Sequence, residues 1–209
     1  MLLDPSRFPL AAAYLNALPF GLESYPDCSL RSEVIEPFRR DFGKVAHAPG
    51  LPPAVVSLLA GPTATKRWVP EVLFQTTNLV IRDVAFQSDA AFFQWTHDVN
   101  HEIFDKPLLR QLMRLFSPTL IVVGAAKRWA AFHRGSTLTS NPVSEANGRV
   151  RASARLDFPE GLFAKVSLEA FEHAFLAALA GSRAKGVEVK LANATPTTAE
   201  YRVSFLAGG

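Results

Sequence analysis

The chain lacks the sequence motifs that indicate thiol, nucleotide or acyl-enzyme chemistry. Its 209 residues include one cysteine, Cys28, which excludes an internal disulfide and suits a reducing compartment. The sequence has no glycine-rich phosphate loop, no G-x-S-x-G turn and no C-x-x-C pair. We therefore predict no catalytic residue and no cofactor, and we favour a protein that is not an enzyme.

Dense charge and long apolar runs are also absent. The net charge is +3, but the basic residues form short pairs such as Arg39–Arg40, so nucleic-acid binding is not expected. No apolar run reaches the roughly 18 residues of a membrane span. The N-terminal stretch carries Asp4 and prolines in place of the basic segment of a signal peptide. We predict a soluble, cytoplasmic protein with no membrane span.

What the chain does contain is aromatic surface in a globular composition. Hydrophobic residues make up 48% and charged residues 20%, a balance typical of a folded domain. There are 16 phenylalanines and 3 tryptophans against 2 methionines, which favours a core or pocket lined by rigid rings. We predict a single domain over residues 1–209.

The first 130 residues predict a mostly helical part. Proline and glycine bound short helices over 27–43 and 50–61. A longer helix is predicted from Pro70 to about Phe86. Ser88 or Asp89 can cap a helix over 90–104, a further helix is predicted over 108–116, and Ser117 can cap one that runs to Phe132. The side chains expected to be buried on the Pro70 helix are Val72, Leu73, Leu79, Val80 and Val84.

Residues 131–209 change to a strand period. Two strands over 136–143 and 149–158 are joined by the polar loop 144–148, and a second hairpin pairs 187–191 with 201–205. An amphipathic helix over 162–181 lies between the hairpins, with Lys165, Glu169 and Glu172 on its wet face. The order predicts an α+β fold: an N-terminal helical layer followed by a ββαββ unit whose antiparallel sheet packs on helices.

One helix carries two histidines four residues apart, in the stretch WTHDVNHEIF. With about 100° per residue, Phe92, Trp95 and Val99 share an apolar stripe, while His97 and His101 share a face at its edge. That face can in principle offer two ligands to one metal ion. A catalytic zinc site needs a third ligand and usually a glutamate between the histidines, where this chain has Asp98. The favoured interpretation is an ordinary exposed helix face.

A second cluster lies in RWAAFHRG, at a predicted junction between helix and strand. Trp129 and Phe132 can form apolar walls there, and His133 or Arg134 can supply polar contact to a ligand. We predict that this segment and the helix around Phe92, Trp95 and Val99 line one pocket against the sheet. The alternative is that the aromatic rings are core residues and the polar ones are solvated.

Four segments carry a resemblance to a known family: YPDCSLRSEVIEPF, SDAAFFQWTHDVNHEIF, PLLRQLMRLFSPTLIVVGAAKRW and FPEGLFAKVSLEAFEHAFLAALAGSRAKGVEVKLANATPTTAEYRVSF. Over residues 20–207 the chain resembles a myxobacterial paralogous family of unknown function. That family is similar to the vinyl-4-reductase-type, haem-NO-binding and TRAPP-subunit domains. The resemblance implies a small-molecule or acyl-chain binding module or a dimerising platform. No Tyr-x-Ser-x-Arg triplet or cysteine cluster is present, so it implies neither haem nor zinc.

Three functions follow as hypotheses. The first is a non-enzymatic domain of a bacterial protein that binds an apolar or acyl small molecule or acts in sensing or interaction. The second is a homodimeric protein–protein interaction module, which an exposed apolar helix face would indicate. The third is a metal-dependent enzyme that uses His97 and His101.

Overall fold

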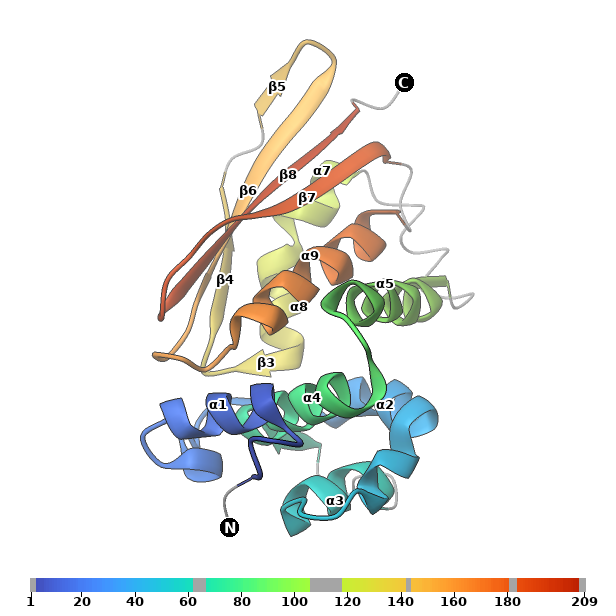
Figure 1. The fold of residues 1–209 in the computed structure, drawn as a ribbon. Coiled ribbons are helices and arrows are strands. Elements are labelled where there is room, and N and C mark those ends of the chain that lie inside the picture. Colours follow the sequence, from blue (N-terminus) through green and yellow to red (C-terminus); the bar gives the residue numbers. More distant parts are fainter. Residues whose placement is uncertain (1–2, 62–66, 106–117, 142–143, 181–183, 207–209) are drawn as a thin grey trace.

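The computed structural model describes residues 3–61, 67–105, 118–141, 144–180 and 184–206. The helix predicted over 108–116, the predicted cap Ser117 and the predicted helix end at residue 181 lie outside these ranges. Within them the α+β class is confirmed: a helical first part is followed by an antiparallel sheet with helices on one face (Figure 1). No helix in this part of the chain is long and apolar enough to cross a membrane.

The first part forms a layer of helices at the base of Figure 1. Proline lies in the first turn of three of them, where its missing N–H removes no helical hydrogen bond. The elements are α1 (Pro9–Ala17), η1 (Gly21–Glu23), β1 (Ser29–Arg31), η2 (Ser32–Ile35), α2 (Glu36–Phe42), η3 (Gly43–His47), α3 (Pro53–Ala60), β2 (Trp68–Pro70) and α4 (Glu71–Ala85). The helix predicted over 27–43 is therefore wrong at Ser29–Arg31, which pairs as a strand.

Helix α4 runs through this layer. The predicted burial of Val72, Leu79 and Val80 is confirmed, whereas Val84 in its last turn is 46% exposed. Near the same end the Asp83 carboxylate accepts hydrogen bonds from the backbone N–H groups at the start of α1, at 3.0 and 3.1 Å. This carboxylate fixes α1 on α4, because the first N–H groups of a helix have no partner within the helix.

The later helices lie above this layer in Figure 1. They are α5 (Asp89–Asp105), α7 (Pro118–Val123), α8 (Ala125–Phe132) and α9 (Lys165–Ala180). Ser88 caps α5 as predicted, since its hydroxyl accepts a hydrogen bond from Ala91 N at 3.2 Å. The helix predicted to run unbroken from 118 to 132 is instead interrupted at Gly124, where the Arg128 guanidinium donates to the carbonyl of Ile121.

Five strands form the main sheet: β4 (Thr137–Ser140), β5 (Ser144–Ala146), β6 (Arg149–Asp157), β7 (Lys185–Ala194) and β8 (Thr198–Leu206). The order is β4-β6-β8-β7, with β5 paired to β6. The loop predicted over 144–148 is in fact β5 and a tight turn. Asn147 and Gly148 have φ of 53° and 70°, and positive φ at both positions is typical of a two-residue hairpin turn.

Helices α8 and α9 cover one face of this sheet, and α5 packs on α9 (Figure 1). Glu172 of α9, predicted on the wet face, is only 17% exposed and its carboxylate accepts a hydrogen bond from Leu191 N of β7 at 2.5 Å. The helix therefore also stabilises the edge strand.

The structure also contains a second, smaller sheet, which the sequence did not predict. Strand β1 pairs antiparallel with β2 on one side and with β3 (His133–Arg134) on the other. Its strands have two or three residues each, too short for an alternating pattern to show. This sheet brings the His133 segment onto the helical layer.

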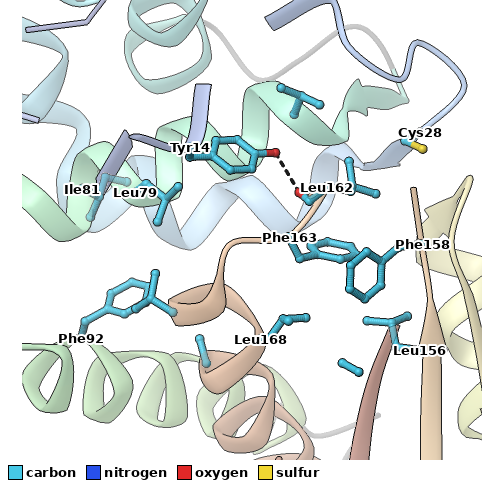
Figure 2. Packing of buried hydrophobic residues seen from close by; sticks show 14 of the residues in the cluster. Tyr14, Cys28, Leu79, Ile81, Phe92, Leu156, Phe158, Leu162, Phe163 and Leu168 are labelled. Atoms are coloured by element: carbon cyan, nitrogen blue, oxygen red, sulfur yellow. Dashed lines mark hydrogen bonds between the residues drawn. The ribbon is translucent and has the colours of Figure 1, made fainter. Parts of the chain in front are cut away.

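One apolar core is shared by both parts of the chain. In Figure 2 the Tyr14 hydroxyl of α1 donates a hydrogen bond to the carbonyl of Leu162, at 2.8 Å, just before α9. Phe163 packs beside it against Phe158, with ring centroids 5.0 Å apart. The helical layer and the sheet are therefore joined through the segment that leads into α9.

Candidate functional site

A buried polar stripe runs along α4. Glu71, Gln75 and Asn78 are only 1%, 1% and 7% exposed. Their spacing of four and then three residues places them within an arc of about 60° on one side of the helix. Arg82 continues the stripe and pairs with Asp89 at the start of α5, at 2.5 Å. One end of the stripe therefore meets β3 and the other meets α5, so this side of α4 faces the sheet half of the molecule.

The Glu71 carboxylate lies at the end of the stripe that meets β3 and makes two polar contacts. Its Oε1 accepts a hydrogen bond from Gln75 Nε2 at 2.9 Å, and its Oε2 lies 3.1 Å from His133 Nδ1. The His133 ring stacks on Trp129 with centroids 3.8 Å apart and planes 7° from parallel. The Trp129 indole N–H in turn donates to the Ser136 hydroxyl at 3.0 Å. A chain of contacts thus fixes the position and plane of the imidazole.

Glu71 also acts on two neighbouring acids. Burial, and then the Glu71 charge, raise the pKa of Tyr14 well above its usual range. Burial and the same charge raise the pKa of Cys28 to about 11. Both groups are therefore protonated at neutral pH, so Tyr14 can donate to Leu162 and Cys28 does not supply a thiolate nucleophile.

Three buried side-chain polar atoms have no hydrogen-bond partner within the described ranges: Gln75 Oε1, Asn78 Oδ1 and Ser167 Oγ. Two of them belong to the α4 stripe. The neighbouring hydroxyls of Thr76 and Thr77 are satisfied, since each donates at 2.8 Å to the carbonyl four residues earlier. On α4 the unpaired oxygens thus lie on one side of the helix, and such groups are rare in folded proteins.

The predicted pocket residues on α5 lie in or beside the core. Phe92 is 1% and Val99 7% exposed, whereas Trp95 is half-buried. The Trp95 ring packs edge-on against Phe38 and Phe42 of α2, each at 4.9 Å, and its indole N–H donates to Asp41 Oδ2 at 2.9 Å. Trp95 therefore joins α5 to α2.

The other predicted residues lie in a separate cluster. Trp129 packs edge-on against Phe163 and Phe171 at 6.4 and 5.5 Å, and no ring contact of the described residues connects it to Trp95. Phe132 is 44% exposed. His133 and Arg134 are adjacent on β3, so they project to opposite faces of the small sheet. Of the seven predicted ligand contacts, the structure brings Trp129 and His133 to the stripe.

The two histidines of α5 form no metal site with their neighbours. Their rings stack with centroids 6.1 Å apart, and His97 Nδ1 lies 3.2 Å from Asp98 Oδ1. Within the described ranges, no group of three or more His, Cys, Asp or Glu side chains is arranged to hold a metal ion. The two histidines are therefore neighbouring side chains on one face of the helix.

Sequence reasoning missed the three stripe residues themselves. In EVLFQTTNLVIRD the polar residues recur every three or four positions inside an apolar helix, a pattern that ordinarily predicts the exposed side. Only the apolar residues on the remaining sides of this helix hint that it is enclosed. Comparisons with protein-family models, curated proteins and solved structures found no match to this chain.

Proposed function

We propose that the protein is a non-catalytic module that binds a small molecule along the polar side of α4. The observation that carries the proposal is the pair of unpartnered oxygens on Gln75 and Asn78, on the same side as the Glu71 carboxylate. A buried polar group without a partner costs about 1–3 kcal/mol. A protein keeps such a cost where polar groups serve a function, and local rules are most often broken at functional sites.

The chemistry of the stripe indicates the kind of ligand. Glu71 Oε1 takes up one Gln75 amide N–H, which orients that amide with its oxygen free to accept. Together with the carboxylate, the stripe thus offers acceptors in an apolar core. The ligand that fits is an apolar or acyl molecule whose head group donates hydrogen bonds, as a hydroxyl or an ammonium group does.

A series with one apolar chain and three head groups tests this. Thermal unfolding is measured with 1-octanol, octylamine and sodium octanoate at equal concentrations. The two donating head groups are expected to raise the unfolding temperature, because a ligand that binds only the folded state stabilises it. Octanoate is expected to raise it least, since its carboxylate would lie beside Glu71. If none of the three changes the unfolding temperature, the proposal is wrong.

The variant Asn78→Leu tests whether the ligand binds at the stripe. Leucine has a similar size and no unpartnered oxygen, so the unliganded variant is expected to gain about 1 kcal/mol of stability and to lose its response to octanol. Asn100→Leu is the matched control, because the Asn100 amide already donates to Thr96 O at 2.8 Å. That variant should gain no stability and should keep its response. An Asn78→Leu variant that keeps the full response contradicts a site at the stripe.

A second candidate function, a homodimeric interaction module, is favoured by apolar exposure on α7 and α8. Leu120, Val123 and Phe132 are 54%, 56% and 44% exposed, and few other large apolar side chains in the described ranges are so open. Light scattering at several protein concentrations tests it. A dimer that dissociates in the double variant Val123→Glu, Phe132→Glu supports this function, and a monomer at all concentrations contradicts it.

A further inference from the structure

The outer face of the small sheet gathers two arginines around one tryptophan. In the ladder, Arg31 of β1 lies opposite Trp68 of β2, and Ser29 of β1 lies opposite Arg134 of β3. Because alternate residues of a strand share a face, Arg31, Trp68 and Arg134 project from the same side. The opposite side carries Leu30, which is completely buried, and His133. Arg134 thus points away from the α4 stripe.

Arg134 packs on Trp68 and has no polar partner among the residues that the structure describes. Its guanidinium carbon lies 3.8 Å from the centroid of the Trp68 ring, within contact distance for a cation–π interaction. Arg134 is exposed, and no carboxylate of the described residues lies within 4.0 Å of it and no acceptor hydrogen-bonds its guanidinium. A stacked guanidinium keeps its N–H donors at the edge of the plane, where they remain available.

The acidic residue nearest to this cluster is already engaged. Glu33 binds Arg31 through two hydrogen bonds of 2.6 and 2.9 Å, and the charges of Arg31 and Arg67 contribute to lowering the pKa of this carboxyl. Arg31 itself lies 5.9 Å from the Trp68 centroid. The Glu33 charge is therefore already engaged by Arg31 and Arg67, and no ion pair to Arg134 is found among the described residues.

We propose that this corner is a binding site for an oxyanion, the carboxylate or phosphate group of a small molecule, held by the edge of the Arg134 guanidinium above Trp68. An arginine fork matches the two oxygens of such a group and forms charge-assisted hydrogen bonds with it. The contact with Trp68 restrains the guanidinium, so less side-chain freedom remains to be lost on binding. The site lies on the other face of β3 from the stripe and does not depend on the proposed function.

The test uses inorganic phosphate and acetate as probes, titrated at constant ionic strength made up with chloride. Two-dimensional NMR follows the Arg134 Nε–H signal and the Trp68 indole signal, which a Trp68→Phe variant identifies among the three tryptophans. Both signals are expected to shift along a saturable curve. Saturation with phosphate alone, with acetate alone or with both assigns the site to phosphate, carboxylate or either group. Failure to saturate with both probes overturns the proposal.

Arg134→Gln should lower the affinity about tenfold or more, because hydrogen bonds to a charged group are lost. The matched control is Arg202→Gln, which removes another exposed strand arginine without a described partner, on the main sheet. This control should leave the titration unchanged. Equal losses in both variants would mean a general charge effect and would overturn the site. Thermal unfolding of both variants should match that of the parent chain, since neither side chain is buried.

Discussion

The five-stranded sheet and helix α4 distribute polar and apolar side chains in opposite ways. Along β6 and β8 every second residue is buried, so that apolar residues such as Leu156 and Tyr201 face the helices and arginines face the solvent. Along α4 the carboxylate and amide side chains of Glu71 and Gln75 are enclosed, and Val84 is exposed. The sheet follows the arrangement that maximises burial of apolar area, whereas α4 departs from it.

The two halves therefore contribute differently to the stability of the fold and to the proposed function. The sheet half holds a continuous apolar face, and its buried Tyr201 hydroxyl donates to Leu168 O at 2.9 Å. Ser167 Oγ of α9 is the one buried side-chain oxygen of this half without a partner in the described ranges. The α4 half holds a buried charge, a stacked histidine and two oxygens without partners. The first arrangement stabilises the fold by apolar burial, and the second lowers stability in exchange for polar groups in the core.

The largest expected effect is in the sheet half. Leu156 is completely buried, so Leu156→Ala should lower the free energy of unfolding by about 3 kcal/mol through lost apolar contact and a residual cavity. Leu206→Ala on neighbouring β8 is the control, because Leu206 is 43% exposed and its truncation should change stability by less than about 0.5 kcal/mol. Urea unfolding measures both. Similar effects in the two variants would contradict the one-sided burial of the sheet.

The sheet half is also where sequence reasoning succeeded. Val150, Ala152 and Leu156 alternate with charged residues, and the observed burial follows that period. The turn at Asn147–Gly148 was included in a longer loop because β5 has only three residues, all of them exposed, and shows no alternation of buried and exposed positions. Local patterns therefore predicted the strands, and pairing across the sheet determined where they begin.

In the helical half the same reasoning did not predict the small sheet or the contacts of the candidate site. Its small sheet joins residues near positions 30, 69 and 133, and no local pattern encodes pairing between such distant, short segments. That pairing places His133 on Glu71 and turns Arg134 to the outer face. The histidine and the tryptophan of RWAAFHRG were selected from sequence, but their carboxylate partner came from a helix whose polar side was expected to be wet.

The second prediction concerns a variant that removes the carboxylate from the polar side of α4. Glu71→Leu leaves His133 Nδ1 and Gln75 Nε2 without their acceptor and should lower the free energy of unfolding by about 2 kcal/mol. Glu102→Gln is the control, because Glu102 is 56% exposed in its ion pair with Arg40 and should change stability by less than about 1 kcal/mol. Chemical unfolding at neutral pH gives both values.

A third variant separates the cost of the charge from the cost of the orphaned donors. The triple change Glu71→Leu, Gln75→Leu, His133→Phe replaces the whole group by apolar side chains and should recover most of the stability that Glu71→Leu loses. If the triple variant is as unstable as the single one, the polar group contributes net stability. The contrast between α4 and the sheet would then be one of appearance only.

The smallest expected effect concerns His173 of α9, which lies between the two halves and stacks on Phe93 of α5 at 5.2 Å. Burial lowers the pKa of this imidazole below its ordinary value; His97 and Lys190 lower it further, and Glu172 opposes them. The stability that depends on the neutral ring is therefore fully present above the unfolded pKa of about 6.5 and is lost as the pH falls through the folded value. His173→Gln should flatten the fall in unfolding temperature as the pH is lowered from about 7 to 5. An unchanged slope would mean that other groups cause the acid sensitivity, and the α5–α9 contact would then act as the apolar face of the sheet does, without a dependence on pH.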